Sequence, residues 1–354
     1  MEPVLTYNRL LHHLVRSDHW LDQGRSSYAL ARSAVDAADF VSAVGYAAMT
    51  VQEATEAYEL YAAWLRQIPV ILEISGIGAT TLDRSVDDIT ARIGAHDFDA
   101  GWVTFQRVIG AFTEACQDSD ADGARALLAE ARGTWQHHHD RACDTIIALL
   151  GLAATHLGEG FVGELWDVLL AEMYDRAATV YDSAERPWAQ SVERLFLDIA
   201  EATRGHLTGP HRDGAFAVVE EADRWVLTFA PCGSGGRIYD VEPTDVPRPV
   251  TTERHDWAWN TEGVCLYCAH CCLLQQRAPI ARLGFPLRVV NPPIQGQSPA
   301  VCTWSIYKDP SLVPDDAYTS VGFAPPAAPD RRDIAAPEVS RARIGFESRD
   351  RRGR

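Results

Sequence analysis

The stretch GPHRDGAFAVVEEADRWVLTFAPC, residues 209–232, marks the point where the chain changes from helix-forming to strand-forming sequence. After its Gly- and Pro-containing start come two short runs, FAVVEEA and RWVLTFA, whose β-branched and aromatic residues are typical of strands. Two more runs of this kind, PLRVVNPP and AVCTWSIYKDP, follow at 286–293 and 300–310. Together the four runs predict a small antiparallel sheet.

The residues before this point, 1–208, are predicted to be nearly all helical. The segments SSYALARSAVDAADF (26–40) and VSAVGYAAMTVQEATEAYELYAAWLRQI (41–68) are rich in Ala and place apolar residues at helical spacing. The expected fold class is therefore α+β, with a helical N-terminal half followed by a small antiparallel sheet that carries a cysteine-rich metal-binding insertion.

Local signals also predict helix boundaries. A long helix is expected to begin near Asp120 or Asp122 and to end near Gly158–Gly160, and a short helix is expected to have Ser85 as its N-cap. The segment LLHHLVRSDHW (10–20) is interpreted as an amphipathic helix with surface histidines.

The chain is predicted to have three parts. Residues 1–118 form a helical, bundle-like region, and residues 119–310 form an α+β domain that contains the cysteine cluster. Residues 311–354 are rich in Pro, Ala and Arg and lack an apolar period, so they are expected to be extended or disordered.

Composition and charge exclude several classes of protein. The chain has 354 residues and 47% apolar composition, but it contains no uncharged apolar run of membrane-spanning length. Its start lacks the features of a signal peptide, so a cytoplasmic location is expected. A net charge of −17 disfavours binding to nucleic acids and to anionic membranes.

Four of the eight cysteines lie in EGVCLYCAHCC, residues 262–272. In a reducing compartment such clustering favours a metal site over disulfides, and a C-x-x-C pair places two thiolates around one zinc ion. The predicted zinc ligands are Cys232, Cys265, Cys268 and Cys271. His270 or Cys272 could instead complete the site, and His255 is a reserve ligand.

Two alternatives to zinc remain open. The C-x-x-C-x-x-C spacing also begins the ferredoxin run for an iron–sulfur cluster, but here Cys272 follows Cys271 directly and the run does not continue in that pattern. A redox-active or nucleophilic thiol is the other alternative. The segment CGSGGR (232–237) is interpreted as a turn that lets the backbone approach a metal or ligand closely.

The helical half offers further candidates. In WQHHHDRACD (135–144) one histidine, His139, is expected to act as an acid–base group oriented by Asp140. A solvated polar face with one core histidine is the alternative interpretation. His255 and Cys272 complete the predicted catalytic set. The three glutamates at 53, 56 and 59 are interpreted as a solvated acidic face, because a di-iron bundle needs E-x-x-H pairs that the chain lacks.

The order RWVLTFAPCGSGGR, CLYCAHCC, GFPLRVVNPP and VCTWSIYKD resembles bacterial proteins related to L-2-amino-thiazoline-4-carboxylate hydrolase. It is also similar in layout to the small-ligand domain of the 4-vinyl reductase type. The resemblance covers about residues 122–309, and the matching positions are Gly284, Val289, Cys302 and Trp304. It implies a compact α+β domain around a small-molecule pocket, and for the hydrolase it implies opening of a C–N bond in a small heterocycle.

These observations predict a zinc-dependent enzyme that acts on a small polar substrate, heterocyclic or amino-acid-like, most simply a hydrolase of C–N bonds. A ligand-binding or interaction module with a structural zinc knuckle is the alternative, and a thiol redox protein is the second alternative. The expected partner is a small-molecule substrate. The Ala-rich helices at 25–67 are also expected to pair in a homodimer, because small residues allow close packing.

Overall fold

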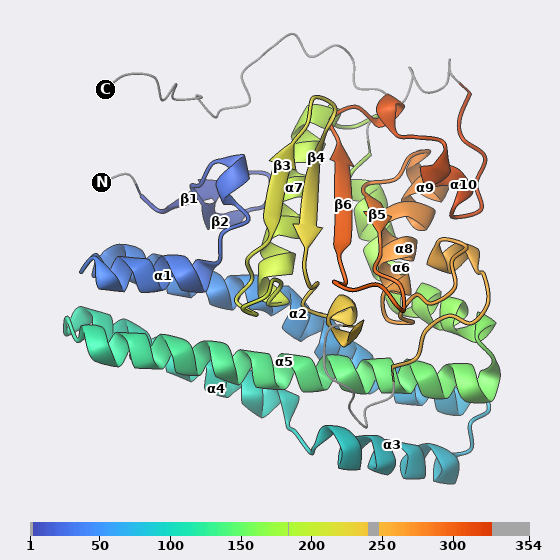
Figure 1. Cartoon of the computed structure of the whole chain (residues 1–354), viewed down its shortest axis with the longest axis horizontal. Helices are drawn as coiled ribbons and strands as arrows, with labels where there is room; N and C mark the ends of the chain where they lie inside the picture. The colour runs from blue at the N-terminus through green and yellow to red at the C-terminus, as the bar shows by residue number, and fades with distance from the viewer. Residues whose placement is uncertain (1–2, 183, 240–247, 328–354) are drawn as a thin grey trace.

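The computed structural model describes residues 3–182, 184–239 and 248–327 (Figure 1). Seven helices of eight or more residues lie in the N-terminal part of these ranges. Their bounds are α1 Ser27–Asp36, α2 Phe40–Ile74, α3 Ala79–Ile93, α4 Phe98–Gln117, α5 Ala121–Leu157, α6 Gly160–Val180 and α7 Trp188–Gly205. The predicted helical half is therefore confirmed.

Polar N-caps start several of these helices. The side chains of Ser26, Asp39, Asp97 and Asp120 each accept a hydrogen bond from a backbone N–H group in the first turn. The helix α5 begins and ends where the sequence predicts, because Asp120 caps its start and Gly158 follows its last residue. In contrast, α3 starts after Gly78, so Ser85 lies inside the helix rather than at its N-cap.

The long helices α2 and α5 extend along the length of the molecule and contact each other (Figure 1). Four alanines of α2, Ala43, Ala47, Ala54 and Ala57, are almost completely buried among the neighbouring helices. They pack inside the chain, and the predicted homodimer through the N-terminal helices stays a prediction. One continuous core joins residues on both sides of the predicted domain boundary at 118–119, where α4 packs against α5.

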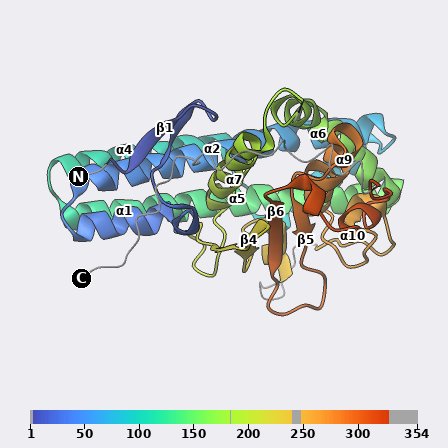
Figure 2. The same ribbon diagram turned by 90° about the horizontal axis from the view of Figure 1, so that it is seen from above.

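The four predicted strands are present and form one antiparallel sheet, in the order β3-β4-β6-β5. Their bounds are β3 Ala217–Glu220, β4 Arg224–Phe229, β5 Val289–Asn291 and β6 Cys302–Tyr307. Buried and partly buried residues alternate along β4, so one face of the sheet is apolar. Figure 2 shows that α6 and α7 lie on one side of this sheet.

The cysteine-rich segment lies between β4 and β5 along the chain. It contains a short helix, α8 (Ala269–Cys272), a π-helical turn over Leu273–Arg277, and α9 (Ala278–Leu283). Such π-helical turns are frequent at functional sites. The segment thus places its histidine and cysteines on a short, irregular helical stretch beside the sheet.

Two terminal predictions differ from the structure. Residues 10–20 do not form an amphipathic helix, because β2 (His13–Arg16) pairs with β1 (Leu5–Asn8) in an antiparallel hairpin. Residues 311–327, predicted to be an extended tail, include α10 (Asp316–Thr319) and bury Val313 and Tyr318. The remainder of the predicted tail, 328–354, lies outside the described residues. Within the described ranges, no helix is both long and apolar enough to cross a membrane.

Candidate active site

A cavity of about 450 Å³ lies between the apolar face of the sheet and the helices α2, α6 and α7. This volume is in the usual range for small-molecule sites. Residues from Gln52 to Trp64 of α2 line it, and at 1.5 Å per residue they span about 18 Å. Phe229 and Trp304 of the sheet line the opposite wall. The cavity can therefore enclose a small organic molecule.

At the Trp64 end of the cavity, a histidine and a cysteine that are neighbours in sequence contact each other. The Sγ atom of Cys271 lies 3.4 Å from Nε2 of His270, and both residues line the cavity. The Nδ1 atom of His270 lies 2.6 Å from the backbone oxygen of Tyr267. A carbonyl only accepts, so Nδ1 carries the proton and Nε2 is free to accept the proton of the thiol.

Burial affects the protonation of both groups. It lowers the pKa of His270 to about 4, although the bond to the Tyr267 carbonyl acts in the opposite direction. Burial also raises the pKa of Cys271 well above its ordinary value. At neutral pH the pair is therefore a thiol and a neutral imidazole. The arrangement has the three parts of a nucleophilic site, a thiol, a base and a group that orients the base, but both pKa shifts oppose transfer of the thiol proton to the imidazole in the free protein.

The adjacent cysteine, Cys272, faces away from the cavity. Successive residues on a helix point about 100° apart, so the two thiols cannot both face one site. The Cys272 thiol donates to the backbone oxygen of Asp256 at 3.5 Å, and the residue is completely buried. Of this pair, the predicted metal ligand Cys271 lines the cavity, and the predicted catalytic residue Cys272 does not.

The predicted catalytic residue His255 also lies outside the cavity wall. Its Nε2 atom lies 2.9 Å from a carboxylate oxygen of Glu159, and its ring stacks on Trp257. Glu159 also accepts bonds from the backbone of Thr252 and Glu253. These contacts attach the loop before the cysteine segment to the start of α6.

Predicted catalytic residues His139 and Asp140 are joined to the cavity through a third residue. The Nδ1 atom of His139 lies 2.9 Å from Asp140, and its Nε2 atom lies 3.0 Å from Nδ1 of His206. His139 is completely buried, whereas His206 lines the cavity. His139 is therefore a core histidine that contacts the site indirectly.

Arg288 lines the cavity and is 7% exposed. It donates to the side chain of Gln275 and to the backbone oxygen of Leu195, and its guanidinium lies 5.6 Å from the ring centroid of Trp304. Within the described part of the chain, Arg288 has no carboxylate as an ion-pair partner, and its Nε atom has no hydrogen-bond partner. Burial lowers its pKa, but a guanidinium stays charged at neutral pH. The cavity wall thus carries a buried positive charge that interacts with the carboxylates of Glu56 and Asp198 without a hydrogen bond to either of them in the described residues.

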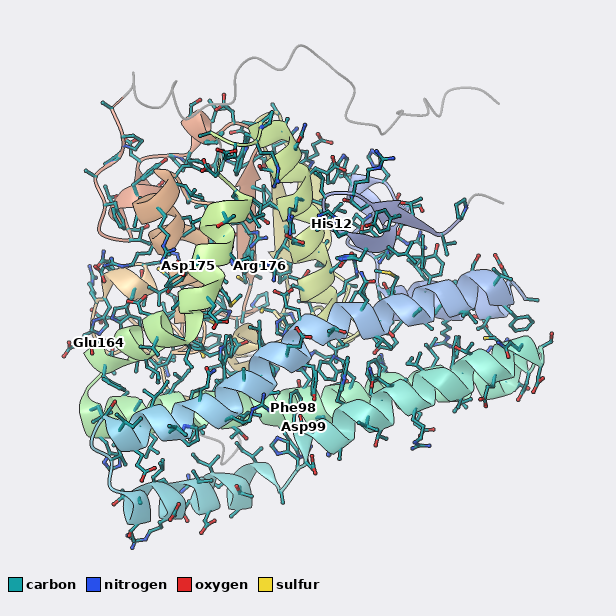
Figure 3. All side chains as sticks on the ribbon, turned by 180° about the vertical axis from the view of Figure 1, so that it is seen from behind. His12, Phe98, Asp99, Glu164, Asp175 and Arg176 are labelled. Atoms are coloured by element: carbon teal, nitrogen blue, oxygen red, sulfur yellow. The ribbon has the colours of Figure 1, made fainter. Side chains whose placement is uncertain are left out.

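Of the three glutamates of α2, interpreted from the sequence as a solvated face, Glu56 and Glu59 are exposed, whereas Glu53 is buried. Glu53 is 3% exposed and lies 2.5 Å from Nε of Arg204. Glu56 and Glu59 line the cavity. The side chain of Glu56 is exposed, but the protein atoms around its carboxyl group desolvate it, and together with the charge of Asp198 this raises its pKa to about 7. Figure 3 labels Arg176, another cavity-lining residue, beside the ribbon of α6, to which it belongs.

The predicted zinc ligands divide into two sets. Cys232 and Cys271 line the cavity, whereas Cys265 and Cys268 are buried at the turn before α8. Burial alone would raise the pKa of Cys265, but hydrogen bonds from the Cys268 thiol and from backbone N–H groups outweigh it, so this pKa is lowered. Among the residues that the structure describes, no three His, Cys, Asp or Glu side chains are grouped to hold a metal ion. The zinc site therefore stays a prediction.

The glycine-rich turn behaves as predicted in one respect, because its backbone approaches other groups closely. A Cβ atom at Gly233 would lie 1.7 Å from the backbone oxygen of His206, and one at Gly235 would lie 2.5 Å from Sγ of Cys268. The turn thereby holds Cys232 beside His206 on the cavity wall. No side chain larger than hydrogen fits at either position.

Comparison of the chain with protein-family models, with curated proteins and with solved structures finds no match. Sequence reasoning did not identify His206, Arg288 or Glu56 as site residues. One signal is present for Arg288, since it is a single charge inside the apolar run PLRVV.

Proposed function

We propose that this protein is a cysteine-dependent hydrolase that cleaves a C–N bond of a small anionic molecule bound in the cavity. The observation that carries the proposal is the contact between Cys271 and His270, with the imidazole oriented by the Tyr267 carbonyl. A nucleophile, a base within reach and a group that orients the base are the three parts of such a site.

Arg288 supports an anionic substrate. A guanidinium binds a carboxylate through paired hydrogen bonds, and a buried one without a hydrogen-bonded carboxylate is costly unless a ligand supplies it. Arg288 is close enough to Cys271 for its positive charge to favour the thiolate form, although burial has the larger and opposite effect. The adjacent ring of Trp304 offers a flat apolar surface. A planar or compact molecule with one carboxylate would therefore place its reactive carbon near the thiol.

The first step forms a thioester-like or thioimidate-like intermediate. The Cys271 sulfur attacks the electrophilic carbon while His270 takes the thiol proton, so a C–S bond forms. The C–N bond then breaks, and the proton on His270 moves to the departing nitrogen. His270 returns to its neutral form, which its lowered pKa favours.

The second step consumes water. The oxygen of a water molecule attacks the same carbon, a C–O bond forms and the C–S bond breaks. One proton of the water finally returns to the sulfur, which restores the thiol. The sum of both steps is the addition of one water molecule across the C–N bond.

This proposal keeps the reaction that the sequence resemblance implies but assigns the attack to a thiol instead of a zinc-bound water. A zinc ion on Cys271 would occupy the same sulfur. Zinc on the thiols of Cys265 and Cys268 would leave it free. The two versions therefore differ in whether Cys271 acts on substrate or on metal.

A substrate panel tests the proposal. The purified protein is incubated with small amides, lactams and cyclic amidines that carry a carboxylate. Mass spectrometry seeks ring-opened products heavier by one water from the cyclic compounds, and the acid and amine fragments from the acyclic amides. Cys271→Ala is expected to abolish turnover, whereas Cys272→Ala should retain most of it because this thiol does not face the cavity. Equal turnover by Cys271→Ala and wild type would contradict the proposal.

A further inference from the structure

Three polar side chains connect the interior of the helical layer with the cavity: Asp140 and His139 on α5, and His206, which directly follows α7. From this geometry we infer that Asp140 and His139 hold a proton on Nδ1 of His206 and thereby leave Nε2 as a base that accepts a proton from water in the cavity. The inference deepens the proposed function, on which its catalytic consequence rests, because it names the group that activates water.

Asp140 sets which atom donates and which accepts in each hydrogen bond among these three side chains. Arg212 donates two hydrogen bonds to this carboxylate, and Arg237 lies 3.5 Å from it. Burial would raise the pKa of Asp140, but the bond with His139 and the two guanidinium charges lower it well below its ordinary value. A carboxylate only accepts hydrogen bonds, so the Nδ1 atom of His139 must donate.

His139 passes this donor–acceptor order on to His206, because its own ring is neutral. It is completely buried, and burial together with the charges of Arg212 and Arg237 lowers its pKa although Asp140 opposes the shift. The neutral ring with a proton on Nδ1 has a lone pair on Nε2. That lone pair faces Nδ1 of His206 at 3.0 Å, so the second histidine must donate there.

A tyrosine near the same nitrogen is compatible with this arrangement. The Tyr61 hydroxyl oxygen lies 3.3 Å from Nδ1 of His206 and 2.8 Å from the Tyr267 hydroxyl. The phenol oxygen can accept the same Nδ1 proton while its own hydrogen is directed to Tyr267. If Tyr61 instead donated to Nδ1 of His206, that nitrogen would carry a lone pair. This lone pair would face the lone pair on Nε2 of His139, and the two would repel.

The remaining nitrogen of His206 has no hydrogen-bond partner in the part of the chain that the structure describes, and the residue lines the cavity. The titratable and charged groups near the ring are His139 of α5, His270 of α8, Arg212 of the following loop and Tyr61 of α2. Burial and the first three of these groups lower the pKa of His206 well below its ordinary value. Nε2 is therefore unprotonated and available.

In the proposed reaction, this nitrogen takes the proton of the attacking water while its oxygen bonds to the carbon attached to Cys271. The proton then returns to the sulfur as the C–S bond breaks. His206 would touch the reacting water and is thus a catalytic residue. His139 and Asp140 act through it and are positioning residues.

Nuclear magnetic resonance reports the proton positions directly. In protein labelled with 15N-histidine, long-range 1H–15N correlation spectra near neutral pH distinguish protonated from unprotonated ring nitrogens, and a His206→Gln spectrum assigns the signals. We expect wild-type His206 to show a protonated Nδ1 and an unprotonated Nε2. In His139→Phe the acceptor is lost, and the proton is expected to move to Nε2, the tautomer that free histidine prefers.

His137→Ala is the matched control, because this neighbouring histidine is exposed and contacts Arg141 instead of the hydrogen-bonded series from Asp140 to His206. It should leave the His206 signals unchanged. A wild-type His206 with its proton on Nε2, or a charged ring, would overturn the inference. If His139→Phe does not fold, Asp140→Asn is the second variant, and an unaltered tautomer of both histidines would count against control by Asp140. Because these spectra need no substrate, their failure is distinguishable from failure of the proposed hydrolysis.

Discussion

The Nε2 atom of His270 lies 3.4 Å from the sulfur of Cys271, the residue that follows it in the sequence. The contact is made on the cavity wall. The next thiol, Cys272, instead bonds to the backbone of Asp256 in the core. Two adjacent cysteines thus have separate roles, one in a site and one in packing.

This separation predicts which thiols react in the native protein. With iodoacetamide at alkaline pH, Cys232 and Cys271 are expected to be alkylated before the buried cysteines, because they are partly exposed on the cavity wall, although the raised pKa of Cys271 slows its reaction. Cys265 and Cys272 are completely buried and should react only after denaturation. Peptide mass spectrometry of a labelling time course measures the order. Labelling of Cys272 before Cys271 would show that the doublet is oriented the other way.

The close approach at Gly233 predicts a loss of stability on substitution. In Gly233→Ala the new methyl group overlaps the backbone oxygen of His206, so the turn or the histidine must move, at a cost of about 1–3 kcal/mol in the free energy of unfolding. Gly133→Ala on α5 is the matched control, since no atom lies within 4 Å and the position is exposed. There the change should stabilise the protein by up to about 1 kcal/mol. Chemical denaturation compares the two, and equal effects would contradict the packing of the turn.

The carboxyl group of Glu56 predicts a pH dependence of stability. Burial and the charge of Asp198 raise its pKa from 4.5 to about 7, against the opposing charge of Arg288. The folded state therefore favours the protonated form of Glu56. The contribution of this group to the free energy of unfolding is fully present below pH 4.5 and is lost as the pH rises through 7. Glu56→Gln cannot ionise. Its melting temperature should match that of wild type near pH 4.5 and exceed it increasingly above pH 7. A difference that is constant with pH would show that Glu56 titrates normally.

The zinc prediction is tested by elemental analysis of the purified protein. A site built on the C-x-x-C pair requires about one equivalent of zinc, and Cys265→Ser or Cys268→Ser should release it. If Cys271 is free for chemistry, Cys271→Ala should keep the metal. Zinc far below one equivalent would contradict the predicted site and leave the thiol mechanism unaffected.

The features that the sequence predicts well are local ones. The long helices and the four strands follow from apolar periodicity, caps and β-branched runs, which depend on neighbouring residues. The hairpin of β1 and β2 was missed because each strand has only four residues, and their pairing depends on packing against α2, where the side chain of Val4 lies over Gly45. Such contacts are not visible in the order of residues alone.

In the site, too, local features can be predicted from the sequence and long-range contacts cannot. The cluster of thiols is evident from its spacing, but which cysteine of the doublet faces the cavity depends on how α8 is rotated against α6 and the sheet. His206 has no motif around it, and Arg288 becomes notable only because the fold buries it without a carboxylate partner. The orientation of His139 by Asp140 could be expected, since they are neighbours, whereas the contact from His139 to His206 spans 67 residues.

The most direct test of the account is the affinity of the cavity for a simple anion. Isothermal titration calorimetry compares benzoate with benzamide, which has nearly the same shape but no charge, on wild type and on Arg288→Met. Arg282→Met is the control, because Arg282 is exposed and already paired with Asp175. We predict that wild type and the control bind benzoate more tightly than benzamide. In Arg288→Met the ratio of benzamide Kd to benzoate Kd should fall by about tenfold or more, as expected for the loss of one charge-assisted hydrogen-bonded pair. Equal binding of benzoate and benzamide by the wild-type protein, or an unchanged preference in Arg288→Met, would contradict the assignment of the cavity as a site for small anionic molecules.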